Sequence, residues 1–569
     1  MRNNLAVCIA ACVLSLSAVS LAQLPVHAEA VSDLSQNHGG GNGPDVHTAT
    51  PIKHLVVIFQ ENVSFDHYFG TYPFAANGKG EPVFYPRPFT PSVNGYDKKL
   101  LTKNPNAANS GNGTGAINPF RLSRAQAATA DQDHDYGPEQ QAFDGGAMDL
   151  FPKYTGTGET LPGAPADENG TGQVMGYYDG NTVTAMWNYA QWFALNDNSY
   201  GTTFGPSTPG AINLVSGQTN GVTATLNGTA NEIADGQGGL TLISDADPIG
   251  DVCSSPSGNQ VQFGGKNVGD LLNAAGVTWG FFEGGFDLTQ VNSNNTTGCA
   301  RTTLSTVTNT VKADYIPHHQ PFQYYTSTAN PTHARPTSVA MIGHQGDAAN
   351  HQYDTNDFYT AVKAGNFPAV SFLKAPGYQD GHAGYSDPLD EQQFIVHVIN
   401  FLQQQPDWKE TAVVIAYDDS DGWYDHQAAP RVNASSTTAD ALDGAGVCKA
   451  HGTLAGTNSK GQPVQGRCGF GPRLPLLVIS PWSRSNHVDH TQTDQSSITR
   501  FIEDNWLRGE RIGGGSFDAV SGSLNSMFDF YQPFPEQRHL ILDESTGQPV
   551  KQPSPWPWPW SSRPQPHHG

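Results

Sequence analysis

The chain has 569 residues, of which 62 are Gly and 40 are Pro, and only 14% of its residues are charged. This composition excludes a charged, disordered chain and indicates a globular scaffold with long, ordered loops. The formal net charge of −23 disfavours nucleic acid as a partner and gives anionic membranes no general attraction.

The first 28 residues are predicted to be a signal peptide for export. Arg2 precedes an almost uninterrupted apolar segment, Leu5 to Ala22, and small residues suitable for cleavage occur up to Ala28. A retained membrane anchor is the alternative, and no other stretch is long and apolar enough to span a membrane. We therefore expect an exported protein, periplasmic or secreted, with a polar leader over residues 29–50.

Alternating strand and helix patterns follow the leader. Apolar runs typical of buried strands occur at 54–59, 277–282, 368–373, 411–417 and 474–480. Helical patterns with terminal capping signals occur at 267–276, 388–406 and 494–507. This alternation predicts an α/β fold with a mostly parallel central sheet flanked by helices.

One large domain over residues 51–545 is preferred to several domains, because the candidate site residues described below run from 61 to 419. Long loop insertions are expected at about 75–130, 216–265, 285–340 and 426–470. Residues 546–569, rich in Pro and Trp, are predicted to form an extended tail.

Four cysteines remain after removal of the signal, and their spacing matches no compact metal-binding motif. Three pairings are possible. Closure between nearest neighbours favours Cys253–Cys299 and Cys448–Cys468, and free thiols are the alternative.

Two of the predicted strands end in side chains with oxygen donors. Glu61 and Asn62 follow the first strand at once, and Asp418 and Asp419 follow the strand at 411–417. In open α/β sheets the carboxyl ends of strands are where ligands bind. Adjacent carboxylates repel each other unless a positive group lies between them. The four residues form an all-oxygen ligand set that suits a divalent metal ion, Ca²⁺ or Mg²⁺ rather than Zn²⁺, and solvated acidic loops are the alternative.

A candidate nucleophile lies in "YGTTFGPSTPGAINLVSG" (200–217). Pro209 suits the first turn of a helix through roughly Gly210 to Val215, which would place Ser207 and Thr208 at its N-terminus, where free amides attract an anion. A hydroxyl there is either a cap or a nucleophile. Metal coordination can activate a serine that has no adjacent base.

Histidines in Gly- and Pro-rich loops could supply positive groups around a phosphate, and one could protonate a leaving oxygen. A lone loop histidine is more often structural or solvated. The four candidates are His134, His318, His319 and His382.

Six segments, in order, make the chain similar to the bacterial phosphoesterase family, which contains non-specific phospholipases C and exported acid phosphatases within the wider alkaline-phosphatase superfamily. The resemblance covers about residues 51–535. The segments are "IKHLVVIFQENVSFDHYFG", "FGPSTPGAINLVSG", "YIPHHQPFQYY", "DGHAGYSDP", "AYDDSDGWYDH" and "PLLVISPWSR".

The resemblance implies an alkaline-phosphatase-like fold and a role for each candidate. Ser207 looks like the nucleophile, with Thr208 as the fallback, and His382 or His319 looks like the group that protonates the leaving alcohol. The implied metal ligands are Glu61, Asn62, Asp418, Asp419 and Ser207, and the implied substrate-binding residues are His134, His318, Asn62 and Thr208.

The chain differs from many relatives at one position and resembles one branch of the family at two others. Val63 stands where many relatives carry Arg, so any role of that Arg is absent. The Asp418–Asp419 pair and the His318–His319 pair resemble the acid phosphatase branch.

The expected function is that of an exported, metal-dependent phosphomonoesterase (acid phosphatase) that works through a phosphoseryl intermediate. The alternative is a phospholipase C acting on phosphodiesters of the phosphatidylcholine type. A non-catalytic protein that binds metal and phosphate is the distant alternative. The expected partner is a small phosphate ester or a phospholipid, with no nucleic acid and no stable membrane insertion. The oligomeric state does not follow from the sequence.

Overall fold

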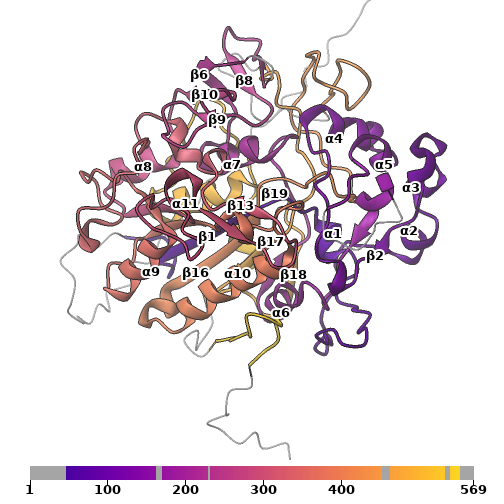
Figure 1. Cartoon of the computed structure of the whole chain (residues 1–569), viewed down its shortest axis with the longest axis horizontal. Helices are drawn as coiled ribbons and strands as arrows, with labels where there is room; N and C mark the ends of the chain where they lie inside the picture. The colour runs from indigo at the N-terminus through magenta and orange to yellow at the C-terminus, as the bar shows by residue number, and fades with distance from the viewer. Residues whose placement is uncertain (1–46, 162–169, 229–230, 451–461, 532–537, 551–569) are drawn as a thin grey trace, which may run out of the picture. The chain divides into compact units, whose positions relative to one another are not determined.

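Eight strands form the central sheet of the protein (Figure 1), whose computed structural model describes residues 47–161, 170–228, 231–450, 462–531 and 538–550. The predicted signal peptide and almost all of the leader, and most of the predicted tail, lie outside these residues. In sheet order the strands are β14 (Gln352–Asp354), β11 (Trp279–Glu283), β15 (Val370–Lys374), β1 (His54–Gln60), β16 (Thr411–Tyr417), β17 (Leu476–Ile479), β4 (Ala194–Asn196) and β18 (His487–Asp489).

The sheet is mostly parallel, as predicted. Strands β14, β11, β15, β1 and β16 run parallel to one another, with Ile58 of β1 opposite Leu373 of β15 and Ile415 of β16. The five strands predicted from the sequence correspond to β1, β11, β15, β16 and β17. Strand β17 departs from the parallel pattern, because it pairs antiparallel with both β16 and β4.

Alternate residues of the central strands enter two separate hydrophobic cores, because successive side chains of a strand point to opposite faces. Val56 and Ile58 pack with α6, α9 and α10, whereas Leu55 and Val57 pack with α7, α8 and α11. Figure 1 shows α10 and α7 on opposite sides of the strands. The helices are α1 (Phe65–Phe69), α2 (Lys98–Thr102), α3 (Pro105–Ala108), α4 (Tyr136–Phe143), α5 (Phe151–Tyr154), α6 (Thr184–Trp192), α7 (Ser207–Ser216), α8 (Val268–Ala275), α9 (Thr355–Lys363), α10 (Pro388–Gln403) and α11 (Ser496–Trp506).

The predicted helices agree closely with α8, α10 and α11, and α8 and α10 each start at a side-chain cap. In α10, the Asp387 carboxylate accepts the N–H groups of Leu389 and Asp390. Helix α7 begins earlier than predicted, at Ser207 instead of about Gly210. Pro206 is extended and serves as the N-cap, and Pro209 then fits the first turn, where a missing N–H costs nothing.

The insertion at 216–265 contains a second sheet that the sequence did not predict. Its five strands, in sheet order, are β7 (Glu232–Ala234), β8 (Leu240–Leu242), β6 (Asn220–Leu226), β10 (Gln260–Phe263) and β9 (Asp247–Pro248). Short two-stranded pairs complete the strand set: β2 (Phe120–Arg121) with β3 (Gly176–Tyr177), β5 (Ser199–Tyr200) with β19 (Thr493–Asp494), and β12 (Thr302–Leu304) with β13 (Val311–Ala313).

Both predicted disulfides, Cys253–Cys299 and Cys448–Cys468, are confirmed. Residues 538–550 pack on the core that contains α6, α9 and α10. Leu540 and Leu542 are buried there, and the Gly547 carbonyl accepts a hydrogen bond from Asn188 of α6. Among the described residues, no helix combines the length and apolarity needed to cross a bilayer.

Candidate active site

Three adjacent parallel strands deliver the centre of the site from their carboxyl ends. Glu61 and Asn62 follow β1, Asp418 and Asp419 follow β16, and Lys374 is the last residue of β15. All five are buried. The sequence therefore predicted correctly that the ends of β1 and β16 meet, since neighbouring parallel strands end at one edge of the sheet.

Helix α7 brings Ser207, its first residue, to the same edge of the sheet. Gly210 makes the approach possible, because a Cβ at this position would lie 2.2 Å from the carbonyl oxygen of Asp418. Gly205, just before the helix, has a φ of +114°, a conformation that L side chains rarely adopt. The two glycines thus have a geometric role in placing the Ser207 hydroxyl against the strand ends.

The Ser207 hydroxyl lies among three oxygen atoms. Its Oγ is 3.0 Å from Glu61 Oε2, 3.1 Å from Asp419 Oδ2 and 3.5 Å from Asn62 Oδ1. A hydroxyl has one proton to donate, so it cannot satisfy three acceptors at once.

Asp418 binds the backbone at the strand ends and the Lys374 side chain. Its Oδ1 accepts the N–H groups of Asn62 at 3.2 Å and Asp419 at 2.8 Å, and its Oδ2 lies 3.3 Å from Lys374 Nζ. Lys374 also forms an ion pair with Glu61 Oε1. The ammonium group thus links the carboxylates that follow β1 and β16.

Sequence reasoning missed Lys374. The predicted strand at 368–373 ends one residue before it, and the rule that identified Glu61 and Asp418 applies equally here, because a polar residue directly follows an apolar strand.

The carboxylates of the site have strongly perturbed proton affinities. Burial and the nearby Glu61 carboxylate raise the pKa of Asp418 well above its usual range. Burial also raises the pKa of Asp419 to about 7, although the His134 charge opposes this. For Glu61, burial favours the neutral form, but the charges of His319 and Lys374 outweigh it and lower its pKa well below the ordinary value.

These residues fit a divalent cation. Three buried carboxylates share one ammonium group, so at least one of them must take up a proton or a second cation. The donors that converge on Ser207 Oγ are carboxylate, carboxamide and hydroxyl oxygens, which suit a hard cation such as Ca²⁺ or Mg²⁺. Among the residues that the structure describes, no histidine nitrogen contacts Ser207 Oγ, which distinguishes this donor set from a typical zinc site.

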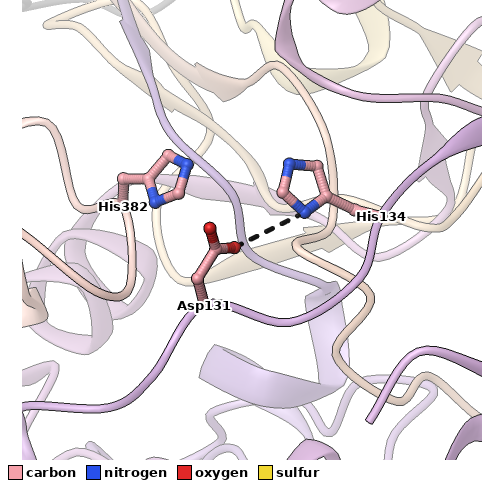
Figure 2. Close-up of side chains that lie close together, drawn as sticks. All are labelled: Asp131, His134 and His382. Atoms are coloured by element: carbon pink, nitrogen blue, oxygen red, sulfur yellow. Dashed lines mark ion pairs between the residues drawn. The ribbon is translucent and has the colours of Figure 1, made fainter. Parts of the chain in front are cut away.

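His134 and His382 present their rings to the same region, beside Asp131 (Figure 2). The Nδ1 of His134 donates to the Gln132 carbonyl at 2.8 Å, and the Nδ1 of His382 donates to the Ala383 carbonyl at 2.6 Å. These bonds fix the ring orientations and leave each Nε2 available. Asn62 lies beside the first ring: its Nδ2 is 3.4 Å from His134 Nε2, while its Oδ1 faces Ser207 Oγ.

The two rings differ in charge. Burial lowers the pKa of His134, but Asp419, Asp421 and Asp131 outweigh it, so the pKa is raised well above the ordinary value. Burial lowers the pKa of His382, and its acidic neighbours do not fully compensate. His134 is therefore a cation suited to binding phosphate, and His382, which gives up its second proton more readily, is the ring suited to transferring a proton through Nε2.

The adjacent histidines after β13, His318 and His319, lie in different environments. His319 is buried, with Nδ1 3.4 Å from Glu61 Oε1, and its Nε2 has no hydrogen-bond partner. His318 is partly exposed, and its Nδ1 lies 3.7 Å from Asp247 of β9. The structure thus brings His319 into the group around Glu61 and turns His318 toward the second sheet.

Thr208 does not face the strand ends. Its N–H and its hydroxyl both donate to Asp245 Oδ1, at 2.9 and 2.8 Å. Ser207 is therefore the hydroxyl placed for attack, and the Thr208 amide at the helix N-terminus is already occupied by a carboxylate. No motif pointed to Asp245, because it lies in the insertion that forms the second sheet.

Comparisons with known proteins find one matching family model and similar proteins named as phospholipases C. The sequence model of the Phosphoesterase family matches residues 52–507. A non-hemolytic phospholipase C of Pseudomonas aeruginosa is 24% identical, with 97% of this chain and 68% of that protein covered. Phospholipase C A of Mycobacterium tuberculosis is 23% identical, with 87% and 80% covered.

Solved structures with a detectable likeness include murine ectonucleotide pyrophosphatase/phosphodiesterase 5, which is 12% identical with a TM-score of 0.27 over 59% of this chain and 93% of that one. A protein in the alkaline phosphatase superfamily from Vibrio parahaemolyticus is 11% identical with a TM-score of 0.23, over 79% and 84% of the two chains.

Proposed function

The chain belongs to the Phosphoesterase family, and from this premise we propose that it is a metal-dependent hydrolase of phosphoric esters of the phospholipase C type. The observation that carries the proposal is the buried Ser207 hydroxyl, held 3.0–3.1 Å from the carboxylates of Glu61 and Asp419. The names of the relatives favour a phospholipase C over the acid phosphatase expected from the sequence. The Phosphoesterase match also argues against the non-catalytic alternative.

Ser207 forms the covalent bond in the proposed reaction. Its proton passes to Asp419 Oδ2 as Oγ attacks phosphorus, and the protonated form of His382 gives its Nε2 proton to the leaving oxygen as the bond from that oxygen to phosphorus breaks, which leaves His382 neutral. Water then attacks the phosphoserine, His382 takes up the water proton, and Asp419 returns its proton to Ser207. A divalent cation held by Glu61, Asn62, Asp419 and Ser207 supplies charge stabilisation at the Ser207 oxygen and the phosphoryl group.

The remaining residues hold the phosphoryl group and the geometry. The positive charge of His134 is suited to bind phosphoryl oxygens. Asp418 orients the strand end through the N–H groups of Asn62 and Asp419.

Phosphomonoester hydrolysis is the second candidate, because the Asp418–Asp419 and His318–His319 pairs resemble the acid phosphatase branch. Under either candidate the protein acts after export directed by residues 1–28, and Ca²⁺ or Mg²⁺ is the proposed ion.

The test uses nitrophenyl phosphate and nitrophenyl phosphorylcholine, before and after chelation, from acidic to mildly alkaline pH. Preferential hydrolysis of the choline diester, lost on chelation and restored by Ca²⁺ or Mg²⁺, is expected. The nucleophile is tested with Ser207→Ala. Thr208→Ala is its matched control, because the Thr208 hydroxyl faces Asp245 and not the strand ends. Preference for the monoester would move the assignment to a phosphatase. Absence of hydrolysis of both substrates by metal-loaded protein would contradict the proposal.

A further inference from the structure

A lysine is buried within the proposed cation site. The Lys374 side chain is 1% exposed, and its Nζ pairs with Glu61 Oε1 and lies 3.3 Å from Asp418 Oδ2. On Glu61 it pairs with Oε1, whereas Ser207 Oγ contacts Oε2 of the same carboxylate. The ammonium group therefore does not compete with Ser207 for the same donor atoms.

We infer that Lys374 is a fixed counter-ion, which allows the site to hold one divalent cation and an anionic phosphoryl group at the same time. This inference rests on the proposed function.

The charges of the site support a compensating role. Glu61, Asp418 and Asp419 carry three negative charges when ionised, and Lys374 reduces the total to two. One divalent cation then makes these four residues neutral as a group, and the cationic His134 beside Asp419 further favours an incoming phosphate. Without the ammonium group, the loaded site would keep one negative charge close to the phosphoryl position, where a low local dielectric makes repulsion strong.

The inference predicts effects of opposite sign on two ligands. Loss of the Lys374 charge should strengthen cation binding, because the carboxylates lose their competing partner, and should weaken phosphate binding, because the loaded site becomes anionic. A lysine that served only to hold the strand ends in place would, on removal, weaken both kinds of binding together.

The variants separate charge from packing. Lys374→Met removes the charge and the hydrogen bonds, Lys374→Gln removes the charge but keeps a donor, and Lys374→Arg keeps the charge. Lys374→Met combined with Asp418→Asn removes one charge of each sign and restores the balance. Lys363→Met, on α9, is the matched control that changes the net charge of the protein equally, outside the site.

The experiment measures the dissociation constants of Ca²⁺ and Mg²⁺ by titration calorimetry, and then that of inorganic phosphate with the cation saturating. For Lys374→Met and Lys374→Gln, we expect the cation to bind about tenfold more tightly and phosphate about tenfold or more weakly. The Arg variant and the Met/Asn double variant should bind phosphate within about threefold of the native protein, as should the Lys363 control.

The outcomes distinguish the inference from its premise. If the native protein binds no divalent cation, the proposed function fails. If the native protein binds both ligands, and Lys374→Gln weakens both or changes neither, the counter-ion role of Lys374 is overturned while the proposed function stands. Charge compensation would also be contradicted if Lys374→Arg binds phosphate normally but the Met/Asn double variant does not recover phosphate binding. The Gln variant keeps the test decisive if Lys374→Met does not fold.

Discussion

Glu139 of α4 joins the turn before α7, the helix that begins at Ser207, to the loop that carries Asp419, and its replacement gives a quantitative prediction. The side chain is 1% exposed. Its Oε2 accepts the N–H of Gly205 at 3.1 Å, and its Oε1 lies 2.6 Å from Ser420 Oγ. Burial, with a contribution from Asp419, raises the pKa of Glu139 from 4.5 to about 8.

The sign of the pH effect follows from this shift. A carboxyl whose pKa is higher in the folded state stabilises the fold fully below the unfolded value, and this stability is lost as the pH rises through the folded value. Between pH 4.5 and about 8, the folded protein holds one proton more than the unfolded chain. The free energy of unfolding should therefore fall by about 1.4 kcal/mol per pH unit from this group, or about 5 kcal/mol across the range.

Glu139→Gln should remove this dependence, because the amide is neutral and can still donate to Ser420 Oγ while accepting from Gly205. The measurement is urea unfolding of chelated protein at several pH values, for the native chain, Glu139→Gln and the exposed control Glu159→Gln. The Glu139→Gln variant should gain stability relative to the native chain as the pH rises. Parallel pH curves for the two proteins would refute the account of Glu139.

Three further predictions concern the site itself. Thr208→Ala, which removes a hydroxyl bonded to Asp245, should leave kcat within about threefold and lower the free energy of unfolding by about 1 kcal/mol; a large loss of kcat would contradict the orientation of Thr208. Asp419→Asn removes a carboxylate 3.1 Å from Ser207 Oγ and should lower kcat by about 10² or more and weaken Ca²⁺ or Mg²⁺ binding in calorimetry; unchanged metal affinity would exclude Asp419 as a ligand. His134→Gln should weaken phosphate inhibition of steady-state hydrolysis by about tenfold or more, and unaltered inhibition would remove His134 from the phosphate site.

The central strands and the two oxygen-donor pairs could be predicted because their signals are local. A continuous apolar run such as Leu55–Phe59 identifies a strand covered on both faces, and Glu61 directly after it identifies a strand end at a ligand-binding edge. The same reasoning located Asp418 and Asp419. The family resemblance added the role of Ser207, whose hydroxyl indeed lies against these carboxylates.

What the sequence did not reveal depends on contacts between distant segments. Asp245 occupies the N-terminus of α7 only because the insertion folds into its own sheet, and Asp131 meets His382 across 251 positions of sequence. The three-residue strands β4, β14 and β18 are too short to give a periodic signal, and pairing in the sheet defines them. Lys374, by contrast, could have been found from its position at a strand end.

The central claim is that Ser207 attacks phosphorus and becomes phosphorylated during turnover. Its most direct test is to quench the metal-loaded enzyme with acid during hydrolysis of a chromogenic ester and to map the modified peptide by mass spectrometry. The account predicts one phosphoryl group on Ser207, absent from Ser207→Ala, whose kcat falls by about 10⁴–10⁶. Near-normal turnover by Ser207→Ala, or a phosphoryl group on another residue, would contradict it.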